Sequence, residues 1–342
     1  MLRLSGRAQT EQSRRRKSPG LAVPCSTVEK TPLTPLPIVL GPTGSGKSEL
    51  GLQLAEELAG EIVNCDSLQL YRGFDIGTAK VLGAERREIP HHLIDLLVPD
   101  QLFTAGDYAR TARAVLHEIT ARGRIPVVVG GTGFYLRALL EGLSPGPQRD
   151  TALRDRLLGR EQKRPGSLHR ILSRLDPEAA ARVHKNDQNK TLRALEIRLL
   201  EGRPRSALFA GGRAPLAGFQ PIRVGLNPPR DLLFRRLDER TAAMFDRGLI
   251  DEVRHLLAAG VSANAKPFES LGYRQALEVV NGRLTPRQAI ESTQTETRQY
   301  AKRQMTWFRK EHEVHWLHGF GNATPIQEQA LEIIRAALRD GE

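Results

Sequence analysis

A short glycine-rich segment near the start of the chain has the residue types and spacing of a phosphate-binding loop. It fits the pattern G-x-x-x-x-G-K-[S/T], in which glycines let backbone amides converge on phosphate oxygens. An apolar run precedes it and a helical pattern follows it, so the amino terminus of that helix adds partial positive charge. We therefore expect a phosphate group to bind at these residues: Gly41, Pro42, Thr43, Gly44, Ser45, Gly46, Lys47 and Ser48.

Two side chains of this loop have separate expected tasks. Lys47 should contact the terminal phosphate, and Ser48 should bind a Mg²⁺ ion. A P-loop enzyme that works on the terminal phosphate also needs an acidic residue after a later apolar strand. Here the strand candidate Val127–Val129 runs into Gly130–Gly133 without an acid. The loop therefore suits a diphosphate that departs as a leaving group, although Asp95 is a weak substitute that leaves kinase chemistry open.

The second candidate for chemistry is Asp66, which follows the apolar run Glu61–Cys65. In a parallel sheet such a residue lies at the carboxyl edge, where the ligands of doubly wound sheets bind. A carboxylate, an amide and a phenol in the loop that follows suit the edge of a nucleobase; the residues concerned are Ser67, Gln69, Tyr71 and the segment Asp75–Lys80. Asp often caps a turn at the end of a strand. Beside a P-loop, however, we interpret Asp66 as a catalytic or binding residue.

The elements that must position these residues alternate between strand and helix. Helical periodicity covers residues 47–59 and 104–122. Short apolar runs predict strands at residues 37–40, 61–65, 125–129 and 221–226, with a further short strand at 314–317. This alternation predicts an α/β fold: a doubly wound parallel sheet of the P-loop NTPase type with helices on both faces.

The chain divides by composition into four segments. Residues 1–34 are basic and contain almost no acid, which predicts a disordered basic arm, with a transit peptide or an over-extended start as alternatives. Residues 35–149 form the first part of the P-loop core. Residues 150–212 are charged and helical in pattern, which predicts a helical insertion that either grips RNA or is an ordinary charged surface. Residues 213–342 resume the core and end in helices.

Composition narrows the classes of protein and partner. Of 342 residues, 39% are hydrophobic and 26% charged, so the chain can bury a core. The two cysteines exclude a disulfide scaffold and a four-cysteine zinc site, and they suit a reducing, cytoplasmic compartment. No apolar run approaches the roughly 20 residues that span a bilayer, so no membrane partner is expected. The net charge of +12 favours a polyanionic partner such as nucleic acid.

Taken together, the spaced motifs resemble those of one family. Besides the P-loop, the set comprises Asp66–Tyr71, Asp75–Lys80, Pro90–Asp95, Gly130–Tyr135, Asn186-Asp187, Arg193–Glu196, Gly272–Gln275 and Lys302–Arg309. From about residue 37 to about residue 318, the chain resembles the tRNA dimethylallyltransferases, also called tRNA isopentenyltransferases. That resemblance implies transfer of a dimethylallyl group from dimethylallyl diphosphate to the exocyclic amine of the adenosine 3′ to the anticodon. It also implies an enzyme that acts as a monomer.

The resemblance also implies roles for individual residues. Asp66 would be the general base, with Thr43 and Arg240 assisting catalysis, and Arg240 would contact the diphosphate together with the P-loop and Mg²⁺. Arg137 is a further candidate for diphosphate binding. The residues implied to contact tRNA are Asp66, Ser67, Leu68, Gln69, Asn189, Lys190, Thr191, Leu192, Arg193, Glu269, Ser270, Leu271, Gly272, Tyr273, Arg274, Lys302, Arg303, Gln304, Met305, Thr306, Trp307, Phe308 and Arg309.

Some residues depart from, or qualify, this pattern. Gly44 and Ser48 replace the commoner Ala and Thr, and Lys190 stands where Arg is usual, which removes a bidentate phosphate contact but keeps the charge. In the basic stretch 298–310 we expect Lys302, Arg303 and Arg309 to face RNA. We expect its aromatic side chains, Tyr300, Trp307 and Phe308, to face the core.

Three other functions remain open. An isopentenyltransferase acting on free AMP, ADP or ATP would share the P-loop and Asp66 but would not need the insertion or the basic stretch. A P-loop small-molecule kinase would need an acid on the third predicted strand. A non-catalytic RNA-binding switch would leave Asp66 and Arg240 without a task.

Overall fold

The computed structural model describes residues 33–143, 146–202 and 212–339, and its centre is a six-stranded parallel sheet. The strand order is β3-β2-β4-β1-β5-β6. The strands are β1 (Thr34–Leu40), β2 (Gly60–Asn64), β3 (His91–His92), β4 (Ile125–Val129), β5 (Phe219–Leu226) and β6 (Val314–Leu317). Because all of them run the same way, the segments that follow β1, β2 and β4 meet at one edge of the sheet.

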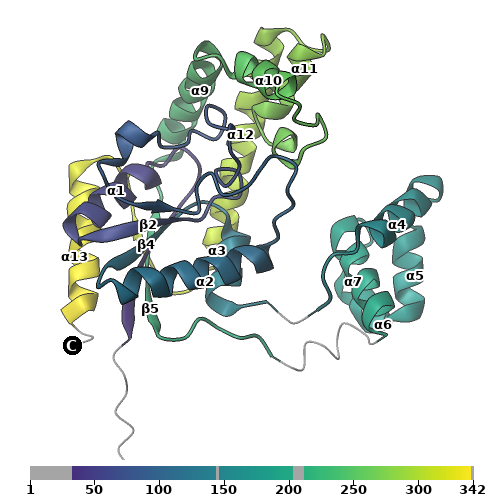
Figure 1. Ribbon diagram of the computed structural model, residues 1–342, viewed down its shortest axis with the longest axis horizontal. Helices are drawn as coiled ribbons and strands as arrows, with labels where there is room; N and C mark the ends of the chain where they lie inside the picture. Colours follow the sequence, from purple (N-terminus) through teal and green to yellow (C-terminus); the bar gives the residue numbers. More distant parts are fainter. Residues whose placement is uncertain (1–32, 144–145, 203–211, 340–342) are drawn as a thin grey trace, which may run out of the picture. The chain divides into compact units, whose positions relative to one another are not determined.

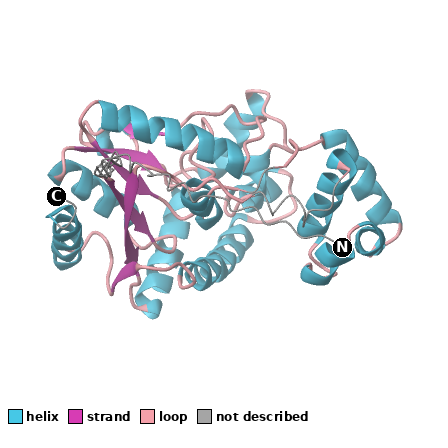
Figure 2. Cartoon of the chain, turned by 90° about the horizontal axis from the view of Figure 1, so that it is seen from below, coloured by secondary structure: helices cyan, strands magenta, loops and turns pink. Residues whose placement is uncertain are grey.

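Side chains of β1 alternate between two hydrophobic cores, which explains why helices cover both faces of the sheet (Figure 2). Ile38 and Leu40 join the core that includes residues of α2 (Ala105–Ala121) and α3 (Gly133–Glu141). Val39 joins the other core, with residues of α1 (Lys47–Glu57) and α13 (Thr324–Arg339) (Figure 1). The predicted doubly wound α/β fold is therefore confirmed.

A group of helices follows β5 and precedes β6. It comprises α9 (Arg230–Asp246), α10 (Leu249–Ala258), the 3₁₀ turn η2 (Lys266–Glu269), α11 (Tyr273–Val280) and α12 (Pro286–Phe308). The longest of these, α12, starts with a capping box at Thr285 and a proline in its first turn. It packs against α9 and α11, and also against α3 beside the sheet. This helix therefore contacts both the helical group and the α/β core.

The part of the insertion that the structure describes, up to residue 202, contains four helices with a hydrophobic core of their own. They are α4 (Thr151–Lys163), α5 (Ser167–Leu175), α6 (Pro177–Arg182) and α7 (Gln188–Glu201). Aspartates at positions 150, 176 and 187 cap the amino termini of α4, α6 and α7. Leu168, Leu172 and Leu195 are almost fully buried between the helices.

Most predicted strands are confirmed, β4 and β6 to the residue, but the sequence missed β3 and shortened β1. Strand β3 has only two residues, His91 and His92, and no apolar run marks it. Strand β1 begins at Thr34 and includes Pro35 and Pro37. Proline has no backbone N–H to donate, which normally argues against a strand. The two prolines are tolerated because β4 pairs only with the later part of β1, so the earlier part of the strand has a hydrogen-bonded neighbour, β5, on one side only. The predicted arm thus ends before Thr34; its residues 1–32 lie outside those described.

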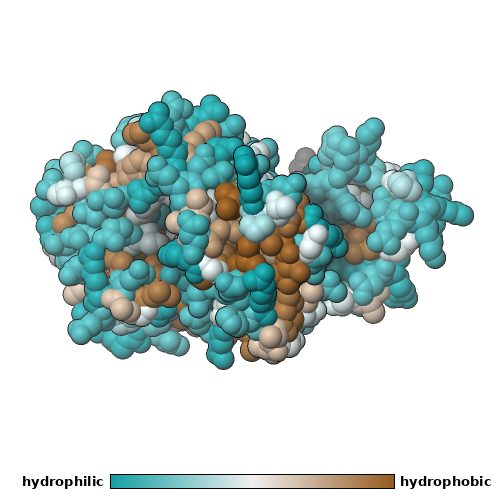
Figure 3. Space-filling model, turned by 90° about the horizontal axis from the view of Figure 1, so that it is seen from above, coloured by the Kyte–Doolittle hydropathy of each residue, from teal (hydrophilic) through white to brown (hydrophobic). Residues whose placement is uncertain are grey.

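Among the described residues, no helix is both long enough and apolar enough to cross a bilayer. The face of the molecule in Figure 3 is mostly hydrophilic, with hydrophobic residues gathered in places. Large exposed hydrophobic side chains include Leu102 and Phe134.

Inside the insertion, one fully buried carboxylate joins α7 to the start of α4. Glu196 of α7 accepts two hydrogen bonds of 2.9 Å from Arg154 and one of 2.6 Å from Arg193. It also accepts the amide of Asp150, at 2.9 Å. Burial opposes ionisation of Glu196, but the hydrogen bonds from Arg154 and Arg193 outweigh it and lower the pKa to about 2.

We predict that Glu196→Gln destabilises the insertion by about 3 kcal/mol, because two arginines lose their buried counter-charge. Ionised Glu196 stabilises the fold above its unfolded pKa of 4.5, and this stabilisation is lost as the pH falls toward the folded value of about 2. Thermal melts followed by circular dichroism between pH 5 and pH 2 measure both effects. Glu178→Gln, at an exposed pair with Arg182, is the control and should change little. An unchanged melt for Glu196→Gln would contradict the prediction.

Candidate active site

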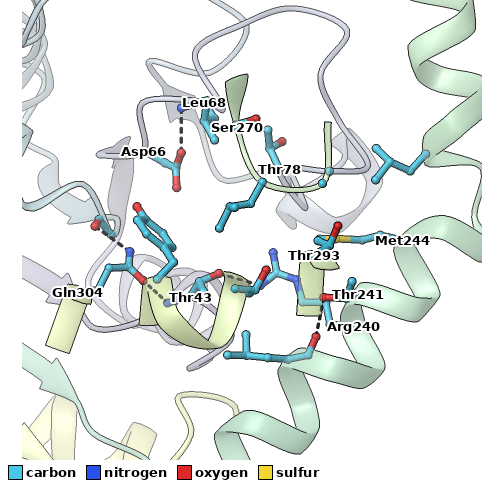
Figure 4. Close-up of a pocket in the computed structure, with 18 of the residues that line it drawn as sticks. Thr43, Asp66, Leu68, Thr78, Arg240, Thr241, Met244, Ser270, Thr293 and Gln304 are labelled. Atoms are coloured by element: carbon cyan, nitrogen blue, oxygen red, sulfur yellow. Dashed lines mark hydrogen bonds between the residues drawn. The ribbon is translucent and has the colours of Figure 1, made fainter. Parts of the chain in front are cut away.

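A cavity of about 300 Å³ lies where the carboxyl edge of the sheet meets the helical group (Figure 4). The sheet side contributes residues of the P-loop, the segment after β2, and Gly131 after β4. The helical side contributes residues of α9 and α12 and the segment Glu269–Gly272. Gly77 and Thr78, from the long connection between β2 and β3, form a further wall.

The P-loop connects β1 to α1, and its glycines allow neighbouring segments to approach closely. Gly44 and Gly46 have φ angles of +76° and +88°, which disfavour any other residue. A Cβ at Gly44 would lie 2.6 Å from Leu237 of α9, and one at Gly46 would lie 2.9 Å from the amide of Gly321. The Lys47 ammonium donates a 2.8 Å hydrogen bond to the Pro42 carbonyl, which folds its side chain back over the loop.

Asp66, Thr43 and Arg240 all line this cavity, as the resemblance implied they should. Asp66 lies two residues beyond β2, and its Oδ1 accepts the Leu68 amide at 2.9 Å. Figure 4 shows its carboxylate directed into the cavity. From α9, the Arg240 guanidinium donates to the Thr43 hydroxyl at 3.4 Å. Three segments that are distant in the sequence thus bring a carboxylate, a hydroxyl and a guanidinium to one space.

The electrostatics of the cavity favour an anion. Burial, assisted by the nearby positive charge of Arg240, lowers the pKa of Lys47 to about 8, although Asp66 opposes the shift. Burial likewise lowers the pKa of Arg240, against the attraction of Asp66. Burial and the Asp66 carboxylate raise the pKa of Tyr300 to about 12, so its phenol stays protonated at neutral pH. Two cations therefore face one carboxylate in a space with little water to hydrate them.

A hydrogen-bonded network centred on Glu252 of α10 holds the Gly77–Thr78 wall. One Glu252 carboxylate oxygen accepts the amides of Asp75 and Ile76 at 3.3 and 2.9 Å, and the other accepts the Tyr273 hydroxyl. That hydroxyl in turn accepts the Gly77 amide at 3.1 Å. Gly77 is required here, because a Cβ would lie 2.4 Å from the Tyr273 ring.

The structure divides the residues implied to contact tRNA into lining, exposed and buried groups. Those lining the cavity are Asp66, Ser67, Leu68, Glu269, Ser270, Leu271, Gly272, Arg303 and Gln304. Exposed residues outside this lining are Asn189, Lys190, Arg274, Lys302, Thr306 and Arg309, and Met305 is half-buried. Of the remainder, Gln69 donates to the Thr78 carbonyl at 3.2 Å, so it supports the wall of the cavity.

Several implied contact residues are occupied inside the protein. Tyr273 and Phe308 are almost fully buried, as are Thr191 and Leu192 in the insertion, so their side chains support neighbouring residues. Arg193 binds Glu196, and half-buried Trp307 packs under the guanidinium of Arg137 at 4.4 Å.

Arg137, the further candidate for diphosphate binding, lies outside the lining of this cavity. It pairs with Glu311 at 2.8 Å. Its role toward the diphosphate stays a prediction.

The sequence analysis also missed residues of this site. Thr241, Met244 and Phe245 of α9 and Leu249 of α10 form an apolar part of the lining. Helical spacing from Arg240 was a signal that could have found Met244, since residues four apart share a helix face. Tyr300 was expected to face the core, but it is 36% exposed and lines the cavity. Glu252 carried no sequence signal.

Comparison with known proteins identifies the family. The family model described as IPP transferase matches residues 69–311, which is most of the chain. The chain belongs to the IPP transferase family. A tRNA dimethylallyltransferase of Solibacter usitatus is 60% identical over 304 residues, covering 89% of this chain and 99% of the relative. A tRNA dimethylallyltransferase of Koribacter versatilis is 52% identical over 301 residues, covering 88% of this chain and 98% of the relative.

Solved structures of IPP transferases resemble this one. The tRNA isopentenylpyrophosphate transferase of Bacillus halodurans is 34% identical, with a TM-score of 0.65, over 90% of this chain and 96% of that chain. A eukaryotic dimethylallyltransferase described as acting on tRNA is 27% identical, with a TM-score of 0.78, over 90% of this chain and 80% of that chain.

We predict that the affinity of the cavity for inorganic diphosphate falls about tenfold between pH 7 and pH 9. The pKa of Lys47 in the free protein is about 8, so raising the pH through this value removes the cation that binds the anion. Isothermal titration calorimetry at both pH values measures the change. Lys47→Met corrects for ionisation of the ligand itself, and a parallel pH dependence in this variant would contradict the assignment to Lys47.

Proposed function

We propose that this IPP transferase moves a dimethylallyl group from dimethylallyl diphosphate to the exocyclic amine of the adenosine 3′-adjacent to the anticodon of a tRNA, releasing diphosphate. The observation that carries the proposal is the cavity in which Asp66 faces the Lys47 and Arg240 cations. The names of the relatives support both the group transferred and the tRNA acceptor.

The diphosphate is the leaving group, and the P-loop side of the cavity stabilises it. Breaking the allylic C–O bond leaves an additional negative charge on the diphosphate oxygen. Lys47, Arg240 and the free amides at the start of α1 are placed to neutralise that charge. Gly131 stands where a phosphate-transferring P-loop enzyme would carry an acid that helps to hold Mg²⁺, so this position offers no acidic side chain for that task.

Asp66 is the general base for the adenine amine. The lone pair of this amine is delocalised into the ring, so the amine is a weak nucleophile until a base draws off its proton. The hydrogen bond from the Leu68 amide fixes one carboxylate oxygen and orients the group. As the new C–N bond forms, the proton passes from the amine to Asp66.

The apolar wall suits the dimethylallyl group. Leu237, Met244, Phe245 and Leu249 are buried and line the cavity beside Arg240. They provide hydrocarbon contacts for the methyl groups. They also exclude water, which would otherwise attack the electron-poor allyl carbon.

Mg²⁺ fits this site as a partner of the diphosphate. Ser48 is exposed at the start of α1, beside Lys47, and its hydroxyl is the donor that we propose for the ion. Among the described residues, no group of three or more His, Cys, Asp or Glu side chains is arranged to hold a metal ion. The ion would therefore take most of its ligands from diphosphate oxygens and water, as Mg²⁺ commonly does, and would offset the leaving-group charge.

The acceptor RNA binds on the helical side. Lys302, Arg303 and Arg309 are exposed on or at the end of α12, and Arg303 reaches the cavity. We propose that they contact phosphates, together with Asn189 and Lys190 at the start of α7. The target base enters unstacked, which costs least for an unpaired base of the anticodon loop.

We predict that Asp66→Ala retains tRNA binding but lowers turnover at least about a hundredfold, because the general base is lost. The assay uses radiolabelled dimethylallyl diphosphate with Mg²⁺, and unmodified tRNA and AMP are supplied in parallel. Asp100→Ala, at an exposed turn, is the matched control and should be fully active. Turnover close to the wild-type rate would exclude Asp66 as the base.

The same assay distinguishes the other functions. Label in tRNA at the adenosine beside the anticodon supports the proposal, whereas label in AMP assigns the chain to free nucleotides. Label in neither acceptor, with ATP turnover instead, favours a kinase. RNA binding without any transfer favours the non-catalytic switch.

We also predict that tRNA affinity falls steeply with salt and that Arg309→Ala reduces the log–log slope by about 0.7–0.9, the loss of one phosphate contact. Filter binding at several salt concentrations measures the slope. Arg287→Ala removes an equally charged side chain of the same helix, but Arg287 pairs with Glu291 at 2.9 Å, so its slope should match the wild type. A wild-type slope near zero would contradict the basic RNA surface.

A further inference from the structure

Gln304 of α12 connects the P-loop to the end of β4 through one buried side chain. Its Oε1 accepts the Thr43 amide at 2.8 Å, and its Nε2 donates to the Gly131 carbonyl at 2.9 Å (Figure 4). The side chain is only 9% exposed, so both hydrogen bonds are largely shielded from water. The oxygen and the nitrogen of the Gln304 amide each therefore hold one backbone group on the sheet side of the cavity.

We propose that Gln304 is a positioning residue for the diphosphate rather than a contact to tRNA. This inference rests on the proposed function, since it concerns the same cavity. With its N–H directed to Gln304, Thr43 is held in one backbone orientation. That orientation places its hydroxyl within 3.4 Å of Arg240. Gln304 thus acts through Thr43 on the part of the site that binds the leaving group.

The absence of a side chain at Gly131 makes this arrangement possible. A Cβ built at Gly131 would lie 2.7 Å from Gln304 Nε2, closer than real contacts allow. Any larger residue would push the Gln304 amide away from the P-loop. The glycine after β4 and the glutamine of α12 therefore form one interlocking unit.

Glutamine is suited to this position because it lies between a backbone N–H and a backbone carbonyl. A glutamine amide offers one acceptor and two donors, so it can satisfy the N–H of one segment and the carbonyl of another. Leucine has a similar size but satisfies neither group. Replacing Gln304 with leucine would leave the Thr43 N–H and the Gly131 carbonyl without these partners, which is unfavourable away from water.

The test compares Gln304→Leu with Gln299→Leu, a matched glutamine that is exposed on the same helix. Inorganic diphosphate affinity is measured by calorimetry, tRNA affinity by filter binding, and kcat and KM by prenyl transfer. We expect Gln304→Leu to weaken diphosphate binding and to raise the KM for dimethylallyl diphosphate by at least about fivefold, the effect of 1 kcal/mol. Its tRNA affinity should stay within about twofold of the wild type, and Gln299→Leu should change neither affinity.

Gly131→Ala provides a second route to the same disruption without removing Gln304. If the two residues act as one unit, the double variant should bind diphosphate no more weakly than the weaker single variant. The single variant Gly131→Ala also keeps the proposal testable if Gln304→Leu does not fold. Circular dichroism reports whether each variant is folded.

Two outcomes would overturn the inference. Weaker tRNA binding with unchanged diphosphate affinity would make Gln304 a direct RNA contact, and unchanged values throughout would make it an inert core residue. Calorimetry with inorganic diphosphate needs no prenyl transfer. A wild-type protein without transfer activity would therefore refute the proposed function while leaving this binding result interpretable.

Discussion

The site is organised by the burial of two cations beside a single carboxylate. Burial removes hydration from Lys47 and Arg240 and lowers the pKa of both groups. The attraction of the Asp66 carboxylate offsets only part of this effect. Among these three groups positive charge therefore exceeds negative charge, which suits the diphosphate that we propose as the ligand of the cavity. The close approach of α9 to the P-loop, which Gly44 permits, is what puts Arg240 within reach of Thr43. The leaving-group side of the cavity therefore depends on backbone packing as much as on charge.

Two structural layers share the work. The parallel sheet delivers the P-loop, Asp66 and Gly131 to one edge, because parallel strands end on the same side. The helical group delivers Arg240, Tyr300 and Gln304. Neither layer contains a complete site, so a charged leaving group and a nucleobase can meet only where the layers face each other. Apolar residues of α9 line the same cavity as these charged groups, which suits the hydrocarbon group that we propose binds there.

The residues that the sheet contributes to the site could be predicted from the sequence better than the residues that the helices contribute. A P-loop is a contiguous motif between a strand and a helix, so its local context fixes its geometry, and Asp66 follows from the end of a strand. Gln304, Glu252 and Tyr273 act through hydrogen bonds to the backbone of distant loops, and nothing in their local sequence pattern says which backbone groups they meet. Tyr273 and Phe308 belong to stretches that resemble RNA-contact motifs, yet they are buried, because one helical motif has both an outer and an inner face. Strand β3 was not predicted because it consists of only two histidines, which form no hydrophobic pattern.

The attachment of the Gly77–Thr78 wall sets the dimensions of the cavity. The bonds from Glu252 and Tyr273 join this wall to α10 and α11, whereas Lys80, buried a few residues later, donates at 2.6 Å to Asp95 near the sheet edge. The wall is therefore attached at one end to the helical group and at the other end to the sheet layer. The width of the cavity at this wall therefore depends on the spacing between the sheet and the helices.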